Sequence, residues 1–197
     1  MRIGADVAPV ELSRGGVTLR PLRRSDERAW HAVRARNREW LRPWEAILPP
    51  GRREAPLTYA GLVRRERKQW REGSAQPYVV TVAGEIVGRV AVAGIRWGAE
   101  CGGSIGYWVD QAHAGRGVTP TAVALAADHA FAAGLHRLEI AVRPENFASL
   151  RVAEKLGFVD EGLRRSYLYI DGAWRDHRVF ARTQDMPRIG RYWTQGD

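Results

Sequence analysis

Apolar and polar positions follow one another along this chain with two periods, one of two residues and one of about 3.6. Alternating runs that end at turn residues predict strands, and apolar positions three or four residues apart predict helices. The predicted strands are residues 17–22, 77–82, 85–92, 102–109, 137–142, 158–170 and 174–183. The predicted helices are residues 25–42, 57–71, 119–133 and 146–156.

Particular residues mark the boundaries of these elements. Ser25 is expected to cap the first helix, and Thr119 is expected to cap the third, with Pro120 in its first turn. Ala83-Gly84 and Asp171-Gly172 each separate two predicted strands, so we expect a hairpin at both places.

The order of the elements is β α α β β β α β α β β, which predicts an α/β protein with a mixed sheet and helices packed on its faces. A chain of 197 residues suits a single domain with a sizeable core. We expect this domain at residues 16–184. An N-terminal extension at 1–15 would precede it, and a C-terminal tail at 185–197 would follow it.

Charge and cysteine content narrow the possible functions. The chain has 31 Lys and Arg against 22 Asp and Glu, and this net charge of +9 can attract an anionic ligand or form a solvated surface. No arginine cluster alternates with aromatic residues in a nucleic-acid motif, so direct nucleic-acid binding is not expected. The single cysteine, Cys101, excludes an internal disulfide and has no metal-ligating neighbour. We therefore expect a cytoplasmic protein without a metal, a signal peptide or a membrane span.

A glycine-rich segment, Gly115-Arg116-Gly117, links the strand at 102–109 to the helix at 119–133. Glycines let backbone N–H groups converge, and the helix adds the positive end of its dipole, so the segment suits a phosphate or a pyrophosphate. The lysine that ends a P-loop is absent. Taken alone, the segment fits a tight turn without a ligand equally well.

A second segment, residues 143–158, opens a helix with Asn146 and Ser149 three positions apart. Both side chains can hydrogen-bond a ligand that lies between this helix and the preceding strand. The alternative is that Asn146 caps the helix and Ser149 bonds only its first turn.

Together these two segments resemble the GNAT acetyltransferases, which carry Q/R-x-x-G-x-G/A followed by N-x-x-[AS] and LGF. The resemblance is closest to the RimJ/RimL branch of ribosomal-protein N-terminal acetyltransferases and covers residues 16–184. The segments at 37–45, 106–110 and 167–177 contribute to it. It implies the GNAT fold, with a mixed, mostly antiparallel central sheet of about seven strands and helices on both faces.

The chain departs from the family pattern at three positions. Ala114 stands where the family has Gln or Arg, and Thr119 stands at the second Gly or Ala. Many GNAT enzymes protonate the leaving thiolate with a tyrosine, and Ala153 occupies that position here. The RimJ/RimL branch resembles this chain in using a serine, which corresponds to Ser149.

The resemblance implies that acetyl-CoA donates an acetyl group directly to a primary amine in a ternary complex. We expect the acceptor to be the N-terminal α-amine of a protein, of the ribosomal-protein type. One alternative is a small-molecule amine, and another is a non-catalytic acyl-CoA-binding or ribosome-associated module. The protein is expected to be a monomer or a homodimer.

The resemblance also implies roles for individual residues. Ser149 would act on the leaving thiolate, a backbone N–H in residues 108–110 would bind the oxyanion, and Glu45 would be the base that takes a proton from the amine. Trp44, Glu45 and Tyr167 are expected to bind the acceptor. The residues expected to bind acetyl-CoA are Trp108, Val109, Gly115, Arg116, Gly117, Val118, Thr119, Asn146 and Ser149.

Other interpretations of the acidic residues and the histidine remain open at this point. Glu45 can instead pair with an arginine and shape its loop. Glu139 and Glu161 are further candidate bases, and Glu139 can also form an ion pair with a neighbouring arginine. Asp176 and His177 are expected to form a hydrogen-bonded pair of structural character on the last strand.

Overall fold

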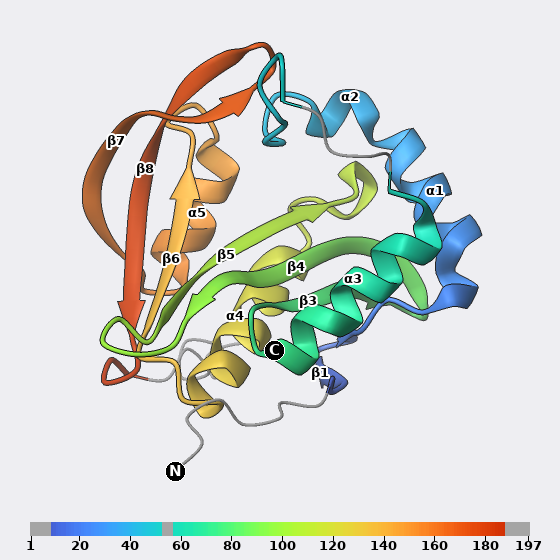
Figure 1. The fold of residues 1–197 in the computed structure, drawn as a ribbon, viewed down its shortest axis with the longest axis horizontal. Helices are drawn as coiled ribbons and strands as arrows, with labels where there is room; N and C mark the ends of the chain where they lie inside the picture. The colour runs from blue at the N-terminus through green and yellow to red at the C-terminus, as the bar shows by residue number, and fades with distance from the viewer. Residues whose placement is uncertain (1–8, 53–56, 188–197) are drawn as a thin grey trace.

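The computed structural model describes residues 9–52 and 57–187 of the chain. An eight-stranded sheet with the order β1-β2-β3-β4-β5-β6-β8-β7 runs through it (Figure 1). The strands are β1 (Leu12–Arg14), β2 (Val17–Arg20), β3 (Gln76–Val82), β4 (Glu85–Arg96), β5 (Gly102–Val109), β6 (Arg137–Val142), β7 (Val159–Ile170) and β8 (Ala173–Thr183). The helices are η1 (Arg24–Asp26), α1 (Glu27–Arg36), α2 (Arg38–Leu41), α3 (Tyr59–Glu72), η2 (Gln111–His113), α4 (Val118–Ala132) and α5 (Phe147–Lys155).

The predicted α/β class and the mixed, mostly antiparallel sheet are confirmed, since only β5 and β6 pair in parallel. The additional strand is β1, which pairs with β2 and lies in the stretch expected as an N-terminal extension. Its three residues are too few to show an alternating pattern. Residues 1–8 of that extension and residues 188–197 of the expected tail lie outside the described residues.

Two predicted helix caps are wrong. Ser25 lies in η1, and Asp26 precedes α1 instead; its carboxylate accepts a hydrogen bond from the Arg23 N–H at 2.8 Å and pairs with Arg20 at 2.7 Å. Gly117, with φ of 79°, holds the cap position of α4, and Thr119 is already inside the helix. Tertiary contacts and a left-handed backbone conformation select these residues, so local capping preference does not decide them.

The first predicted helix is divided into α1 and α2 at Asn37, whose backbone leaves the helical region. The Asn37 side chain is buried and donates a hydrogen bond to the Val33 carbonyl at 2.9 Å. This contact competes with regular helix hydrogen bonding, as asparagine side chains often do.

Both predicted hairpins are confirmed. The central residues Ala83 and Gly84 have φ of 49° and 82°, and Asp171 and Gly172 have φ of 47° and 79°. Positive φ at both positions is the type I′ geometry that fits the twist of the flanking strands. The second hairpin joins the long strands β7 and β8.

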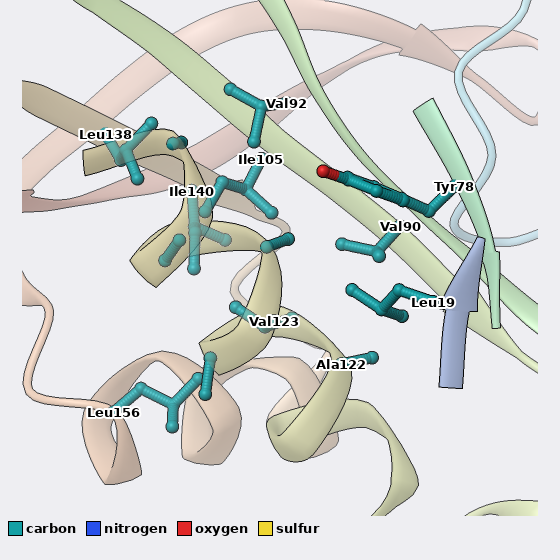
Figure 2. Packing of buried hydrophobic residues seen from close by; sticks show 14 of the residues in the cluster. Leu19, Tyr78, Val90, Val92, Ile105, Ala122, Val123, Leu138, Ile140 and Leu156 are labelled. Carbon is teal, nitrogen blue, oxygen red and sulfur yellow. The ribbon is translucent and has the colours of Figure 1, made fainter. Parts of the chain in front are cut away.

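The larger core lies on the face of the sheet covered by α4 and α5. Figure 2 shows side chains from several strands meeting Ala122 and Val123 of α4 and Leu156 after α5. Alternate residues of β3 divide between the two faces: Tyr78 and Val80 join this core, while Val79 joins a smaller one. The smaller core lies under α1 and α3 and contains Leu22, Val33, Tyr59, Val63, Val79 and Ile86. Helices therefore cover both faces, as predicted.

The sheet opens between its two parallel strands. β5 and β6 pair only from Gly102–Arg137 to Ser104–Glu139, although β5 continues to Val109 and β6 to Val142. Beyond these pairs the two strands diverge, as Figure 1 shows. The backbone groups of the diverging segments that face the gap are then without a partner strand, which makes the gap suited to binding a polar, extended ligand.

Candidate active site

Two cavities meet at the opening between β5 and β6. One, of about 390 Å³, lies on the side of α1, and the other, of about 570 Å³, lies beside α4 and α5. Both are lined by Leu41, Trp44, Tyr107, Trp108, Asn146 and Ser149. We call the first the α1-side cavity and the second the α4-side cavity. Because the same six residues line both, the two cavities are adjacent at this opening.

The glycine loop lies along the α4-side cavity. Ala114, Gly115, Gly117, Thr119 and Pro120 line it, and Gly115 and Gly117 have φ of 75° and 79°. The loop leads directly into the first turn of the 15-residue helix α4. The unpaired N–H groups and the dipole of that helix end face the cavity, so an anion is favoured there.

Two loop residues predicted to bind the co-substrate do not line this cavity. The side chain of Val118 is buried in the larger core, and Arg116 is exposed. The remaining predicted residues, Trp108, Val109, Gly115, Gly117, Thr119, Asn146 and Ser149, are all brought together there. Sequence reasoning missed the aromatic and basic residues Trp40, Tyr107, Phe147, Arg151 and Lys155, which also line the cavity.

Asp110 anchors the start of the glycine loop to the first helices. Its side chain is 4% exposed and accepts hydrogen bonds from Arg36 Nε at 3.0 Å and Asn37 Nδ2 at 2.9 Å. Asn37 Oδ1 in turn accepts from the Gln111 N–H at 2.9 Å. Burial by itself raises the pKa of Asp110, but the hydrogen bonds from Arg36 and Asn37 outweigh it and hold the pKa below its usual range. The carboxylate is therefore ionised and the loop is fixed at its base.

The contacts between β4 and the end of β5 show which backbone amide groups of β5 point toward the gap. The Asp110 N–H donates to the Val87 carbonyl at 2.7 Å, and a Cβ at Gly88 would lie 2.5 Å from the Trp108 carbonyl oxygen, so the backbone of Trp108 also faces β4. Antiparallel pairing alternates, so the backbone of Val109 faces the opening. The Trp40 indole donates to the Val109 carbonyl from that side at 3.1 Å. Of residues 108–110, Val109 is the one whose N–H points toward the gap.

Asn146 caps α5, as the alternative interpretation of the sequence predicted. Its Oδ1 accepts from the Ser149 N–H at 3.1 Å, and the Ser149 carbonyl accepts from the Tyr107 hydroxyl at 3.3 Å. Burial raises the pKa of Tyr107 to about 12, although its contact with Ser149 acts in the opposite direction, so this tyrosine stays neutral. The helix cap uses the backbone of Ser149, and the residue itself lies where both cavities meet.

Glu45 lies in the α1-side cavity, where the Arg34 guanidinium holds it. Arg34 Nη2 donates to both carboxylate oxygens at 2.7 Å, and its guanidinium carbon lies 5.3 Å from the centre of the Trp108 ring. The alternative prediction of an arginine partner is therefore confirmed, and the carboxylate still lines the cavity. The carboxylate thus lies in a cavity wall that also carries the guanidinium groups of Arg34, Arg89 and Arg143.

The loop at 43–47 closes one side of the α1-side cavity. Arg143 donates to the Pro43 carbonyl at 2.7 Å and lies 5.4 Å from the centre of the Trp44 ring. The Ile47 N–H donates to the Tyr169 carbonyl at 3.0 Å, and Ala46 bridges to Ile170. Figure 1 shows this meeting of the segment after α2 with the tip of the β7–β8 hairpin. Trp44, predicted as an acceptor residue, lines both cavities.

The two other candidate bases lie away from both cavity linings. Glu139 pairs with Arg137 at 2.9 Å and with Arg164 at 3.0 Å, and Glu161 pairs with Arg137. The ion-pair interpretation of Glu139 is confirmed. Tyr167, 36% exposed, does not line the cavity itself but places its ring 5.7 Å from that of His177, which does.

The expected pair of Asp176 and His177 is wrong. Neighbouring residues of a strand point to opposite faces, so the two side chains diverge. Asp176 accepts from the Ser166 N–H at 2.8 Å, while His177 Nδ1 lies 3.0 Å from the Arg175 carbonyl oxygen. His177 instead lines the α1-side cavity.

Comparison with known proteins agrees with this geometry. The family model described as an acetyltransferase (GNAT) domain matches residues 17–159. The chain belongs to the GNAT acetyltransferase family. Within it, the Escherichia coli [ribosomal protein uS5]-alanine N-acetyltransferase is 30% identical over 168 residues, which cover 80% of this chain and 84% of that protein. A Bacillus subtilis protein named "Probable N-acetyltransferase YjcK" is 44% identical over 97 residues, about half of each protein, at 49% and 54%.

A solved structure gives the same result for the fold. Mycobacterium smegmatis RimJ, determined in complex with CoA-disulfide, superposes with a TM-score of 0.82 at 36% identity, covering 94% of this chain and 91% of that one. The predicted GNAT fold and the resemblance to RimJ/RimL-type acetyltransferases are confirmed.

The described part of the chain offers neither a metal site nor a membrane span. Residues 9–52 and 57–187 contain no group of three or more His, Cys, Asp and Glu side chains placed to hold a metal ion. Among these residues, no helix is both long and apolar enough to cross a membrane.

The anchoring of the loop by Asp110 can be tested by replacing Asp110 with asparagine. Hydrogen bonds to a charged group contribute about 1.5–3 kcal/mol, so Asp110→Asn should lower the free energy of unfolding at pH 7 by about that amount. The pKa of Asp110 in the folded protein lies below the ordinary 3.8. The stabilisation that Asp110 gives the folded state is therefore present above pH 3.8 and is lost as the pH falls through the pKa of the folded protein. Urea unfolding from pH 7 to pH 3 measures the difference.

Glu72→Gln, at the exposed end of α3, serves as the control because it removes the same charge without a buried partner. The anchoring role would be contradicted if Asp110→Asn lost no more free energy of unfolding than Glu72→Gln. It would also be contradicted if the loss stayed constant down to pH 3.

Proposed function

We propose that this protein transfers the acetyl group of acetyl-CoA to the N-terminal α-amine of a protein in a ternary complex. The observation that carries the proposal is the pair of cavities that meet at Ser149 through the gap between β5 and β6. One cavity has the loop and helix end that favour an anion, and the other has a carboxylate at 2.7 Å from its arginine partner. A donor with phosphates matches the first environment. In the second, Glu45 is the acidic residue of a lining that also holds Arg34, Arg89 and Arg143, so it is the group that would receive the ammonium of an acceptor.

Acetyl-CoA would enter through the α4-side cavity as a substrate. Its pyrophosphate would lie on the N–H groups after Gly115 and Gly117, where a Cβ added to either glycine would meet no other atom within 4 Å, so the backbone is open to a ligand. The thioester would then reach the gap beside β5. Mycobacterium smegmatis RimJ, with 36% identity, was determined with a CoA compound, which supports this assignment.

The chemistry requires three actions around the thioester carbon. A neutral amine attacks it, the Val109 N–H donates a hydrogen bond to the carbonyl oxygen as charge develops, and the Ser149 hydroxyl donates a proton to the departing thiolate. Ser149 suits this role because the helix cap and the Tyr107 hydroxyl bond its backbone groups, and the residue lines both cavities.

Glu45 is proposed to receive the acceptor. Its carboxylate would attract the α-ammonium group and, through a water molecule, take the proton that must leave before attack. An α-amine has a pKa of about 7.7–8.0, well below the ~10.4 of lysine, so a weak base is sufficient for this step. The E. coli relative, 30% identical to this chain, is named for acetylating an alanine of ribosomal protein uS5, which supports an α-amine acceptor.

The proposal is tested with peptides that begin with Ala, Ser, Thr or Met, each with a free and with an acetylated N-terminus. Release of free thiol from acetyl-CoA should depend on the free α-amine, and acetyl-CoA alone should raise the Tm. Turnover only with polyamines or other small amines would favour a small-molecule acceptor. Acetyl-CoA binding without any turnover would indicate a non-catalytic module, and neither binding nor turnover would overturn the proposal.

Ser149→Ala tests the role of the hydroxyl. Loss of a positioned proton donor costs about 100-fold or more in rate, so kcat should fall by about that factor while the KM for acetyl-CoA changes little. Ser149→Thr, which keeps a hydroxyl, should recover much of the rate. Steady-state kinetics with the best peptide measures both, and an unchanged kcat in Ser149→Ala would remove this residue from the mechanism.

Glu45→Gln tests the role of the carboxylate. The variant should lose at least about 10-fold in kcat/KM at pH 7, where most of the acceptor is ammonium with a pKa of about 7.7–8.0. The deficit should shrink toward pH 9, because the amine is then already neutral. Glu39→Gln on α2, whose carboxylate lies 3.6 Å from Arg42 and is mostly exposed, is the matched control. An equal deficit at all pH values would argue for a structural role of Glu45 with Arg34.

A further inference from the structure

His177 is a buried histidine in the wall of the α1-side cavity. It lies on β8, is 2% exposed and lines the same cavity as Ser149 and Glu45. Strand alternation explains its direction: Val179, two residues later, pairs with Ala141 of β6, which also lines this cavity. The sheet therefore holds the imidazole ring toward the place where the acceptor would lie.

One hydrogen bond selects the tautomer of His177. Nδ1 lies 3.0 Å from the Arg175 carbonyl oxygen, and a carbonyl can only accept, so Nδ1 carries the hydrogen. In the neutral ring Nε2 then holds a lone pair and no hydrogen. Within residues 9–52 and 57–187 the only hydrogen bond of this ring is the one at Nδ1, and the ring of Tyr167 packs against it at 5.7 Å. Nε2 is the ring atom that can bond a ligand in the cavity.

The surroundings of His177 keep the ring neutral. Burial is the largest effect and lowers its pKa below the usual 6.5, and the guanidinium of Arg143 after β6 lowers it further. The hydrogen bond to Arg175 and the carboxylates of Asp176 and Glu145 act in the opposite direction but do not outweigh the burial. Arg164, the β7 residue paired with His177, forms an ion pair with Glu139 at 3.0 Å.

We propose that Nε2 of His177 accepts the proton that the acceptor nitrogen loses once it has bonded to the thioester carbon. His177 would thus be a further catalytic residue, on a different wall of the cavity from the loop that holds Glu45. This inference rests on the proposed function, because it assumes an amine in the α1-side cavity.

Each proton that moves in the proposed reaction has a defined donor and acceptor. The α-ammonium loses a first proton to water beside Glu45, and the neutral amine then forms the C–N bond, which leaves a positive nitrogen in the tetrahedral adduct. That nitrogen gives a second proton to Nε2, the C–S bond breaks, and the thiolate takes a proton from Ser149. His177 returns its proton to solvent and Ser149 regains one from water. The sum is ammonium plus thioester giving amide, thiol and one released proton.

Glu45 is a poorer candidate for the second proton than His177. Both of its oxygens accept from Arg34 at 2.7 Å, whereas Nε2 of His177 has no such partner in the described residues. Glu139 and Glu161 pair with arginines outside the cavity lining. Within the part of the chain that the structure describes, His177 is the histidine that lines this cavity.

The test compares His177→Asn with wild type. Asparagine keeps an N–H that can bond the Arg175 carbonyl but has no basic nitrogen at the Nε2 position. Loss of a general base costs about 10²–10⁴-fold, so kcat should fall within that range and the acid limb of its pH profile should disappear. The acetyl-CoA-induced rise in Tm should persist. His136→Asn, the same change at an exposed histidine, is the control and should keep the wild-type rate and profile.

A wild-type measurement keeps the inference testable if His177→Asn does not fold. Nitrogen-15 NMR of the histidine rings should show Nδ1–H for His177, with a pKa that matches the acid limb of kcat. An Nε2–H tautomer, or a kcat in His177→Asn within about threefold of wild type with the acid limb retained, would overturn the inference. Wild-type protein that fails to acetylate any peptide would instead overturn the proposed function, which separates the two failures.

Discussion

The backbone of β5 and β6 runs in parallel for three residue pairs, from Gly102–Arg137 to Ser104–Glu139, and then separates. Every strand on one side of this point belongs to the antiparallel series β1 to β5, and β6, β8 and β7 form the other side. A sheet that divides in this way leaves amide groups of β5 without a partner strand at the centre of the protein. The site depends on this separation, because it joins the two cavities and directs the Val109 amide into the space between them.

Arginine contacts hold the parts around the gap in place. Arg34 fixes Glu45, Arg143 fixes the chain at Pro43, and Arg36 with Asn37 fixes Asp110 at the base of the glycine loop. The arginines join segments far apart in the sequence, such as residues 36 and 110. A guanidinium suits this task because it donates several hydrogen bonds in one plane and stays charged when partly buried. Part of the high arginine content thus serves the internal geometry of the site as well as the surface charge.

The polar side chains where the two cavities meet are held in position or in one protonation state by different contacts. Ser149 is held through its backbone by Asn146 and Tyr107, and burial keeps Tyr107 neutral beside it. Ala153, at the position where the family resemblance implied a tyrosine in many enzymes, is buried in the larger core and offers no group to a thiolate. His177 is kept neutral and in one tautomer by burial and by the Arg175 carbonyl. One cavity thus holds a hydroxyl that can donate a proton and a neutral imidazole that can accept one, beside a carboxylate that is paired with Arg34.

The amino-acid sequence by itself determined most of the elements and their order, since periodicity and turn residues act locally. It placed β6 and both hairpins at Ala83-Gly84 and Asp171-Gly172, and the glycine loop and the Asn146–Ser149 spacing pointed to the family. It missed β1, whose three residues are in the sheet only because β2 is beside them, and it misplaced the caps at Ser25 and Thr119. Only the tertiary structure decided which groups meet: Arg34 with Glu45, Asn37 with Asp110, and His177 with the cavity that Ser149 lines. These contacts join residues far apart in the chain, and their energies depend on burial and distance, which no local pattern records.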